Sequence, residues 1–74
     1  MDEMNYLYEI EQAANSYEIA ETLNVIRGAN PKAEMIYQEH FNKARTMMKR
    51  IAEDYEKEYS DVLKDVRFRV KTRH

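Results

Sequence analysis

The chain has no cysteine and no tryptophan, and it has only one glycine and one proline among its 74 residues. Without cysteine there can be no disulfide framework and no thiolate metal site, which is typical of proteins from a reducing cytoplasm. No apolar run exceeds three residues, so the sequence predicts neither a membrane span nor the core of a signal peptide. We therefore expect a soluble cytoplasmic protein with no membrane partner.

What the chain has instead is a large share of helix-forming residues, chiefly Glu, Ala, Lys, Arg and Met. Hydrophobic residues make up 43% of the sequence and charged residues 35%, a balance that argues against disorder. A chain of this length holds one domain at most, and a single core of this size is only marginally stable. We expect one helical domain over residues 1–74.

The glycine and the proline lie close together in the segment Gly28-Ala29-Asn30-Pro31. Gly28 suits the left-handed position that follows many helices, while Asn30 and Pro31 suit the N-cap and first turn of the next helix. Apolar residues recur at steps of three and four on both sides of this segment. The sequence predicts a helix at about 3–27, a break at 28–31 and a second helix at about 31–65.

The second predicted helix is the longer one, and its apolar stripe continues as far as Val66. At about 1.5 Å per residue it would extend past an antiparallel first helix by ~10–25 Å. We therefore expect an all-α fold, an antiparallel helical hairpin with a longer second helix that dimerises into a four-helix bundle. The alternative is a monomer whose tyrosines are half-buried in its core. The residues expected to bind a partner lie on the overhang and are Tyr55, Tyr59, Val62 and Val66.

Charge is distributed unevenly along the chain. Residues 1–26 contain six acids and no base, whereas residues 64–74 contain five bases and one acid. Either the two ends meet on folding or across an oligomer, or the basic end binds a polyanion. The net charge of −2 favours the first interpretation over nucleic-acid binding. The candidate nucleic-acid contacts are Lys57, Lys64, Arg67, Arg69, Lys71 and Arg73.

The basic tail, residues 66–74, alternates apolar and basic residues, which is the period of a strand. Three structures remain open for it: a continuing helix, a disordered tail, or a strand that pairs with a partner. In a helix, Val66 and Val70 would join the apolar stripe while Phe68 would lie on the polar side.

Residues suited to catalysis or metal binding are few. A di-iron helix needs glutamate three residues before its histidine, and the residue three before His40 is Tyr37. The pairs Glu18/Glu21 and Glu53/Glu56 lack a histidine and are expected to be solvated charges. There is no glycine-rich phosphate loop and no evident nucleophile–base pair. The sequence thus predicts no catalytic residue, no metal and no cofactor.

The segment Tyr17–Val25 resembles the first helix of a helix-turn-helix motif. The motif's second helix would then contain Pro31, which removes a backbone donor and clashes with the preceding turn. The sequence therefore favours a small non-enzymatic adaptor or regulator that binds itself and an unidentified protein partner. The alternative is a nucleic-acid-binding accessory protein that uses the basic C-terminal segment.

Overall fold

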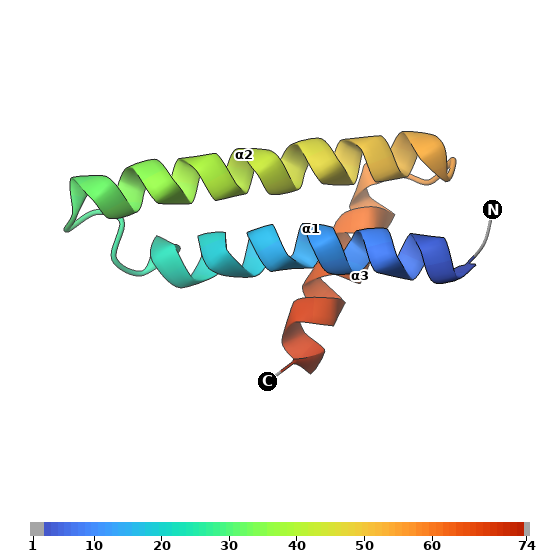
Figure 1. Ribbon diagram of the computed structural model, residues 1–74, viewed down its shortest axis with the longest axis horizontal. Coiled ribbons are helices and arrows are strands. Elements are labelled where there is room, and N and C mark those ends of the chain that lie inside the picture. Colours follow the sequence, from blue (N-terminus) through green and yellow to red (C-terminus); the bar gives the residue numbers. More distant parts are fainter. Residues whose placement is uncertain (1–2, 74) are drawn as a thin grey trace.

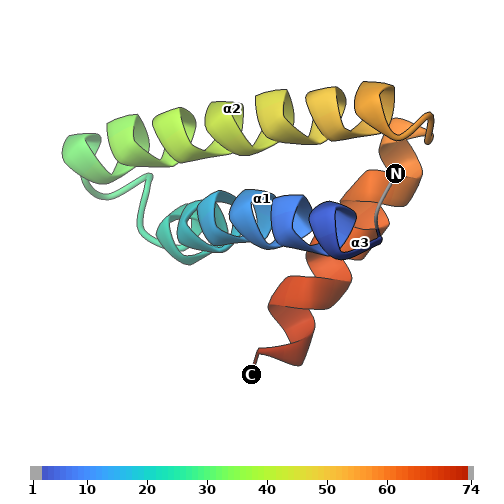
Figure 2. The same cartoon turned by 45° about the vertical axis from the view of Figure 1, so that its right-hand side comes forward.

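The computed structural model describes residues 3–73, which form three helices joined by two short connections. Helix α1 spans Glu3–Asn24, α2 spans Pro31–Asp54 and α3 spans Tyr59–Thr72. Figures 1 and 2 show α1 and α2 side by side and antiparallel, while α3 turns back from the end of α2 and crosses α1. The all-α prediction is confirmed, and the described chain has three helices where two were predicted.

The start of α2 agrees with the prediction. Asn30 has an extended backbone, and its side chain accepts hydrogen bonds from the backbone N–H groups of Lys32 and Ala33 at 2.9 and 3.4 Å. Pro31 occupies the first turn, where its missing N–H leaves no hydrogen bond unmade. These two residues fix the start of α2.

The end of α1 differs from the prediction, because the helix stops at Asn24 rather than near Arg27. The turn that follows is closed by hydrogen bonds from the Ile26 N–H to the Leu23 carbonyl and from the Ala29 N–H to the Ile26 carbonyl, each 3.1 Å. Within residues 3–73 no glycine has a positive φ, so the left-handed conformation predicted for Gly28 is wrong.

The left-handed residue lies instead in a second break, which was not predicted from the sequence. Helix α2 ends at Asp54, and Glu56 has a φ of +53°. The Lys57 N–H bonds to the Ala52 carbonyl at 2.9 Å and the Glu56 N–H to the Glu53 carbonyl at 3.4 Å. This is a Schellman motif, with glutamate at the position that usually holds glycine. The prediction of one continuous helix at 31–65 is therefore wrong: the chain breaks after Asp54, and residues 59–65 belong to α3.

This second break sends α3 back onto the other two helices. Val62 and Val66 are fully buried and Val70 is 7% exposed, whereas Phe68 is 67% exposed on the outer side. For residues 66–73 the helical interpretation of the tail is thus correct, and the strand and disordered interpretations are wrong. His74, the last residue of the predicted tail, lies outside the described residues.

The core lies where α3 covers the first half of α1 and the second half of α2. Its buried members are Tyr6, Ile10, Ala13, Ala14, Ala44, Met48, Ile51, Ala52, Val62, Val66 and Val70. The apolar stripe expected on an uncovered overhang is therefore part of the core of one chain. None of the three described helices is long and apolar enough to cross a membrane.

Candidate interaction site

The acidic start of the chain and its basic end meet within one molecule. Arg69 and Arg73 both form ion pairs with Glu11. Arg73 Nη1 also lies 2.7 Å from Glu18 Oε1, and Arg73 Nη2 donates a hydrogen bond to Asn15 Oδ1 at 2.8 Å. The interpretation that the two charged ends meet on folding is confirmed, and the prediction of a solvated Glu18 is wrong.

These ion pairs shift the protonation equilibria of their members. The hydrogen bond from Arg69 holds the pKa of the Glu11 carboxyl below its ordinary value, and Arg73 adds to this effect. The hydrogen bond to Glu18 raises the pKa of the Arg73 guanidinium. Both shifts stabilise the charged forms, so these contacts hold the last turn of α3 against α1.

A second contact between the two ends lies at Tyr6, near the start of α1. Its hydroxyl donates a hydrogen bond to the Asp65 carboxylate on α3. Its ring lies edge-on to Tyr55, with centroids 5.1 Å apart, and the Lys57 ammonium is 4.4 Å from the Tyr6 ring centroid. Burial of the Tyr6 hydroxyl raises its pKa well above the ordinary value, and the hydrogen bond to Asp65 raises it further.

An apolar groove lies beside this contact, between α1 and α3. We call it the α1–α3 groove; it has a volume of about 680 Å³, and Tyr6 and Ile10 contribute to its lining. Its large apolar side chains are highly exposed: Met4 72%, Leu7 54%, Tyr8 65% and Phe68 67%. Four large exposed apolar side chains around one groove make this surface the candidate interaction site of the described chain.

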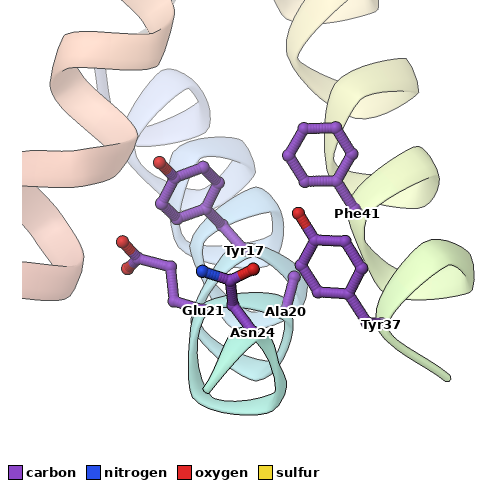
Figure 3. Close-up of a pocket in the computed structure, with 6 residues that line it drawn as sticks. All are labelled: Tyr17, Ala20, Glu21, Asn24, Tyr37 and Phe41. Atoms are coloured by element: carbon purple, nitrogen blue, oxygen red, sulfur yellow. The ribbon is translucent and has the colours of Figure 1, made fainter. Parts of the chain in front are cut away.

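A smaller pocket lies near the turn that joins α1 to α2 and is lined by residues of these two helices. Figure 3 shows Tyr17, Ala20, Glu21 and Asn24 of α1 facing Tyr37 and Phe41 of α2 around a space of about 210 Å³.

The pocket's α2 wall is held in place by aromatic and ionic contacts. Tyr37 and Phe41 stack with centroids 5.6 Å apart, and the Arg27 guanidinium lies 3.9 Å from the Tyr37 centroid. Arg27 also pairs with Glu34 at 2.7 Å. These contacts stabilise the turn, so we assign the pocket a structural role.

Apolar side chains of α1, of α2 and of the turn between them are exposed outside the α1–α3 groove as well. Ile19 and Ile36 are each 42% exposed and Ile26 is 49% exposed. These fractions are lower than those of the α1–α3 groove.

The residues predicted to bind a partner are placed differently from expectation. Val62 and Val66 lie in the core with no exposed surface. Tyr55 and Tyr59 are half-buried and pack against that core. The predicted overhang of the second helix does not exist, because α3 folds back onto α1.

The six predicted nucleic-acid contacts divide into two groups. Arg69 and Arg73 are held in ion pairs, and Lys57 lies over the Tyr6 ring. Lys64, Arg67 and Lys71 are exposed on α3, and within residues 3–73 none of them lies within ion-pair distance of a carboxylate. Among residues 3–73, two of the six predicted contacts are thus paired with carboxylates, and the other four are exposed.

Among residues 3–73, no group of three or more His, Asp or Glu side chains could hold a metal ion. His40 is half-buried, and its Nδ1 is buried without a hydrogen-bond partner.

The α1–α3 groove was not predicted, because it exists only where α3 packs beside α1. The spacing of three residues between Met4 and Leu7 was the available signal in the sequence. The chain matches no protein-family model, no curated protein and no solved structure.

Proposed function

We propose that this chain is a small non-enzymatic protein of the cytoplasm that acts through helical surfaces, by self-association and by binding a partner protein. The observation that carries this proposal is the α1–α3 groove, whose four large apolar side chains are more than half exposed. Leaving such a surface in water is unfavourable by roughly 25 cal/mol per Å² of apolar area. A binding partner that covers it would recover this free energy.

The way α1 divides its small and large side chains between the core and the surface supports the same proposal. Its buried residues are mostly small: Ala13, Ala14, Ser16 and Ala20, together with Tyr6 and Ile10. Several of its larger apolar residues, such as Met4, Leu7 and Ile19, are exposed. A helix that served only the core of a monomer would bury its large apolar residues first. Helix α1 therefore suits a role in binding.

The predicted dimeric four-helix bundle remains one form that self-association could take. It would pair the α1–α2 sides that carry Ile19 and Ile36 and would leave α3 outside the bundle. The partner protein, in an adaptor or regulator role, would occupy whichever apolar surface the dimer leaves free.

A second candidate function is nucleic-acid binding, favoured by the three exposed cations Lys64, Arg67 and Lys71 on one face of α3. Neutralising about three phosphates would make the affinity fall with salt at a slope near −0.9 per phosphate. A fluorescence-anisotropy titration with mixed-sequence DNA and RNA tests this. The absence of binding at low salt would remove this candidate.

The test of the interaction proposal combines sedimentation velocity with photo-crosslinking of the tagged chain in its native host. We expect a sedimentation coefficient that rises from micromolar to near-millimolar concentration, or a specific crosslinked partner. A chain that remains monomeric throughout and gives no specific crosslinked species would contradict the proposal.

A further inference from the structure

We infer that the outer side of α3 binds single-stranded nucleic acid, with its phosphates held by unpaired cations and one base stacked on Phe68. This inference rests on the second candidate function and specifies its ligand and its contacts. We call the surface the α3 basic face, and its residues are Lys64, Arg67, Phe68 and Lys71.

The four residues of the α3 basic face lie together because of their spacing. Counted from Lys64, they occupy helix positions i, i+3, i+4 and i+7, which fall on one side of a helix. All four are exposed, and the three buried valines of α3 lie on the opposite side, against the core. From Lys64 to Lys71 the face extends about 10 Å along the helix.

The α3 basic face borders two hollows in the surface. The larger one has a volume of about 440 Å³ and is lined by all four residues of the face, by Val70 and by Glu21 of α1. The smaller one, of about 250 Å³, shares Lys64 and Arg67 with it and reaches Ser60 near the start of α3. The shared cations therefore lie where one extended chain could contact both hollows.

The positive charge of this face is not cancelled within the described chain. Among residues 3–73, none of its three cations has a carboxylate within ion-pair distance. The other two arginines of α3, Arg69 and Arg73, are paired with Glu11 and Glu18, so those four charges cancel locally. A chain with a net charge of −2 can therefore present a cationic surface to a polyanion.

Two acids limit the strength of this surface. Asp61 is exposed three residues before Lys64, and Glu21 lines the larger hollow from α1. Each would repel a phosphate group, so removing the charge of Glu21 should strengthen binding. A third acid, Asp65, accepts a hydrogen bond from Tyr6 and lines the α1–α3 groove instead.

Phe68 distinguishes single-stranded nucleic acid from other polyanions. Its ring is 67% exposed and lies between the cations, where an unstacked base could stack on it. The bases of a duplex are already stacked on each other, so only a single strand can supply one. An anionic membrane would need a broader apolar surface than one phenyl ring. The α3 basic face therefore fits a single strand best.

The first experiment measures binding of short fluorescent single strands by anisotropy at low salt, with RNA and DNA versions to show which is preferred. Phe68→Ala should lower the affinity by about 5- to 100-fold, as expected for one stacked base, and circular dichroism verifies its folding. The affinity for an abasic strand of the same length should not change.

The contribution of the cations is measured with the same strands over a range of salt concentrations. Lys64→Gln should weaken binding to normal and abasic strands alike and should reduce the salt slope by about 0.7. Lys49→Gln is the matched control, because Lys49 is also an exposed lysine but lies on α2 outside the face. It should leave both the affinity and the slope unchanged.

The second experiment uses a substitution that should strengthen binding, a result that unfolding cannot imitate. Glu21→Gln removes the acid that lines the larger hollow, so the affinity for the single strand should rise several-fold. Glu39→Gln makes the same change at an exposed position of α2 and should have little effect.

Three results would overturn the inference. Equal affinities for single strand, duplex and abasic strand, with no effect of Phe68→Ala, would reduce the contact to simple electrostatics, and the second candidate function would stand. The absence of binding to any nucleic acid at low salt would remove that function as well. Binding to vesicles of phosphatidylserine and phosphatidylcholine, but not to single strands, would assign the face to a membrane surface.

Discussion

The Tyr6 hydroxyl donates a hydrogen bond to the Asp65 carboxylate, and this bond joins residues 59 positions apart in the sequence. It ties the start of α1 to the middle of α3 directly beside the exposed apolar groove. Together with the ion pairs of Arg73, it fixes the two walls of that groove relative to each other. The candidate binding surface is thus built on contacts between the two ends of the chain.

The Tyr6 contact predicts a decline in stability at high pH. Burial and the bond to Asp65 raise the Tyr6 pKa above its ordinary value of 10.0, so the folded state binds the phenol proton more tightly than the unfolded state. This contribution is complete below pH 10.0 and is lost as the pH rises above it. Urea unfolding across this range should show a steeper loss of stability for the natural chain than for Tyr6→Phe. Equal slopes would show that the bond does not form in solution.

Removing the Arg73 guanidinium should destabilise the fold. Its side chain is 16% exposed and contacts Glu11, Glu18 and Asn15, so we expect Arg73→Ala to lower the free energy of unfolding by about 1–2 kcal/mol. Lys71→Ala, also in the last part of α3 but exposed, should stay within about 0.5 kcal/mol of the natural chain. Chemical denaturation of the three proteins gives the comparison, and equal losses in both variants would contradict the assignment.

The same ion pairs predict sensitivity to acid. The Glu11 pKa is below its ordinary value of 4.5 in the folded state, so its contribution to stability is present above that pH and is lost as the pH falls through the lowered pKa. Glu11→Gln should therefore flatten the dependence of unfolding free energy on pH in this acidic range. An unchanged pH profile would mean that Glu11 is not paired.

The packing of α3 can be tested with two residues that lie two positions apart. Val66 is fully buried and Phe68 is 67% exposed, so Val66→Ala should lower the free energy of unfolding by about 2 kcal/mol. Phe68→Ala removes more atoms but should change the free energy of unfolding by no more than about 0.5 kcal/mol when measured at low protein concentration. The reverse order would indicate that α3 does not pack as described.

The two chain breaks predict stabilising substitutions. Glu56 has a φ of +53°, which costs about 1 kcal/mol for a residue with a Cβ, so Glu56→Gly should raise the melting temperature by roughly 4–8 °C. Gly28 has no positive φ, and a Cβ added there would meet no heavy atom within 4 Å. Gly28→Ala should therefore stabilise the fold by about 0.4–1 kcal/mol. Thermal unfolding measures both, and destabilisation by either change would contradict the described turn.

These two breaks also show how far the sequence could be interpreted. Asn30 and Pro31 carry local signals for a helix start, and the prediction there was correct. The break after Asp54 has no glycine or proline, and its left-handed residue is a glutamate. Local propensity favours a continuous helix at such a site. The Schellman hydrogen bonds and the burial of Val62 and Val66 on α1 stabilise the break, and these are not visible in a local pattern.

The sequence predicted the contact between the charged ends of the chain but not the position of the candidate binding surface. The uneven charge of residues 1–26 and 64–74 correctly indicated that the ends could meet. The binding surface could not be located, because the position of α3 decides which apolar residues are covered. Once α3 folds back, Val62 and Val66 become core, and Phe68 and Leu7 become the exposed pair beside the groove.

The central claim is that the α1–α3 groove is the binding surface, and a dilution series of amide NMR spectra tests it most directly. As the concentration rises, we expect the resonances of Leu7, Tyr8 and Phe68 to shift together along one binding curve. The resonances of Val25 and Met35, which are 84% and 72% exposed elsewhere, should stay fixed. The absence of shifts at any concentration would exclude self-association through the groove and leave a partner protein as its occupant, whereas shifts confined to Ile19 and Ile36 would contradict the account.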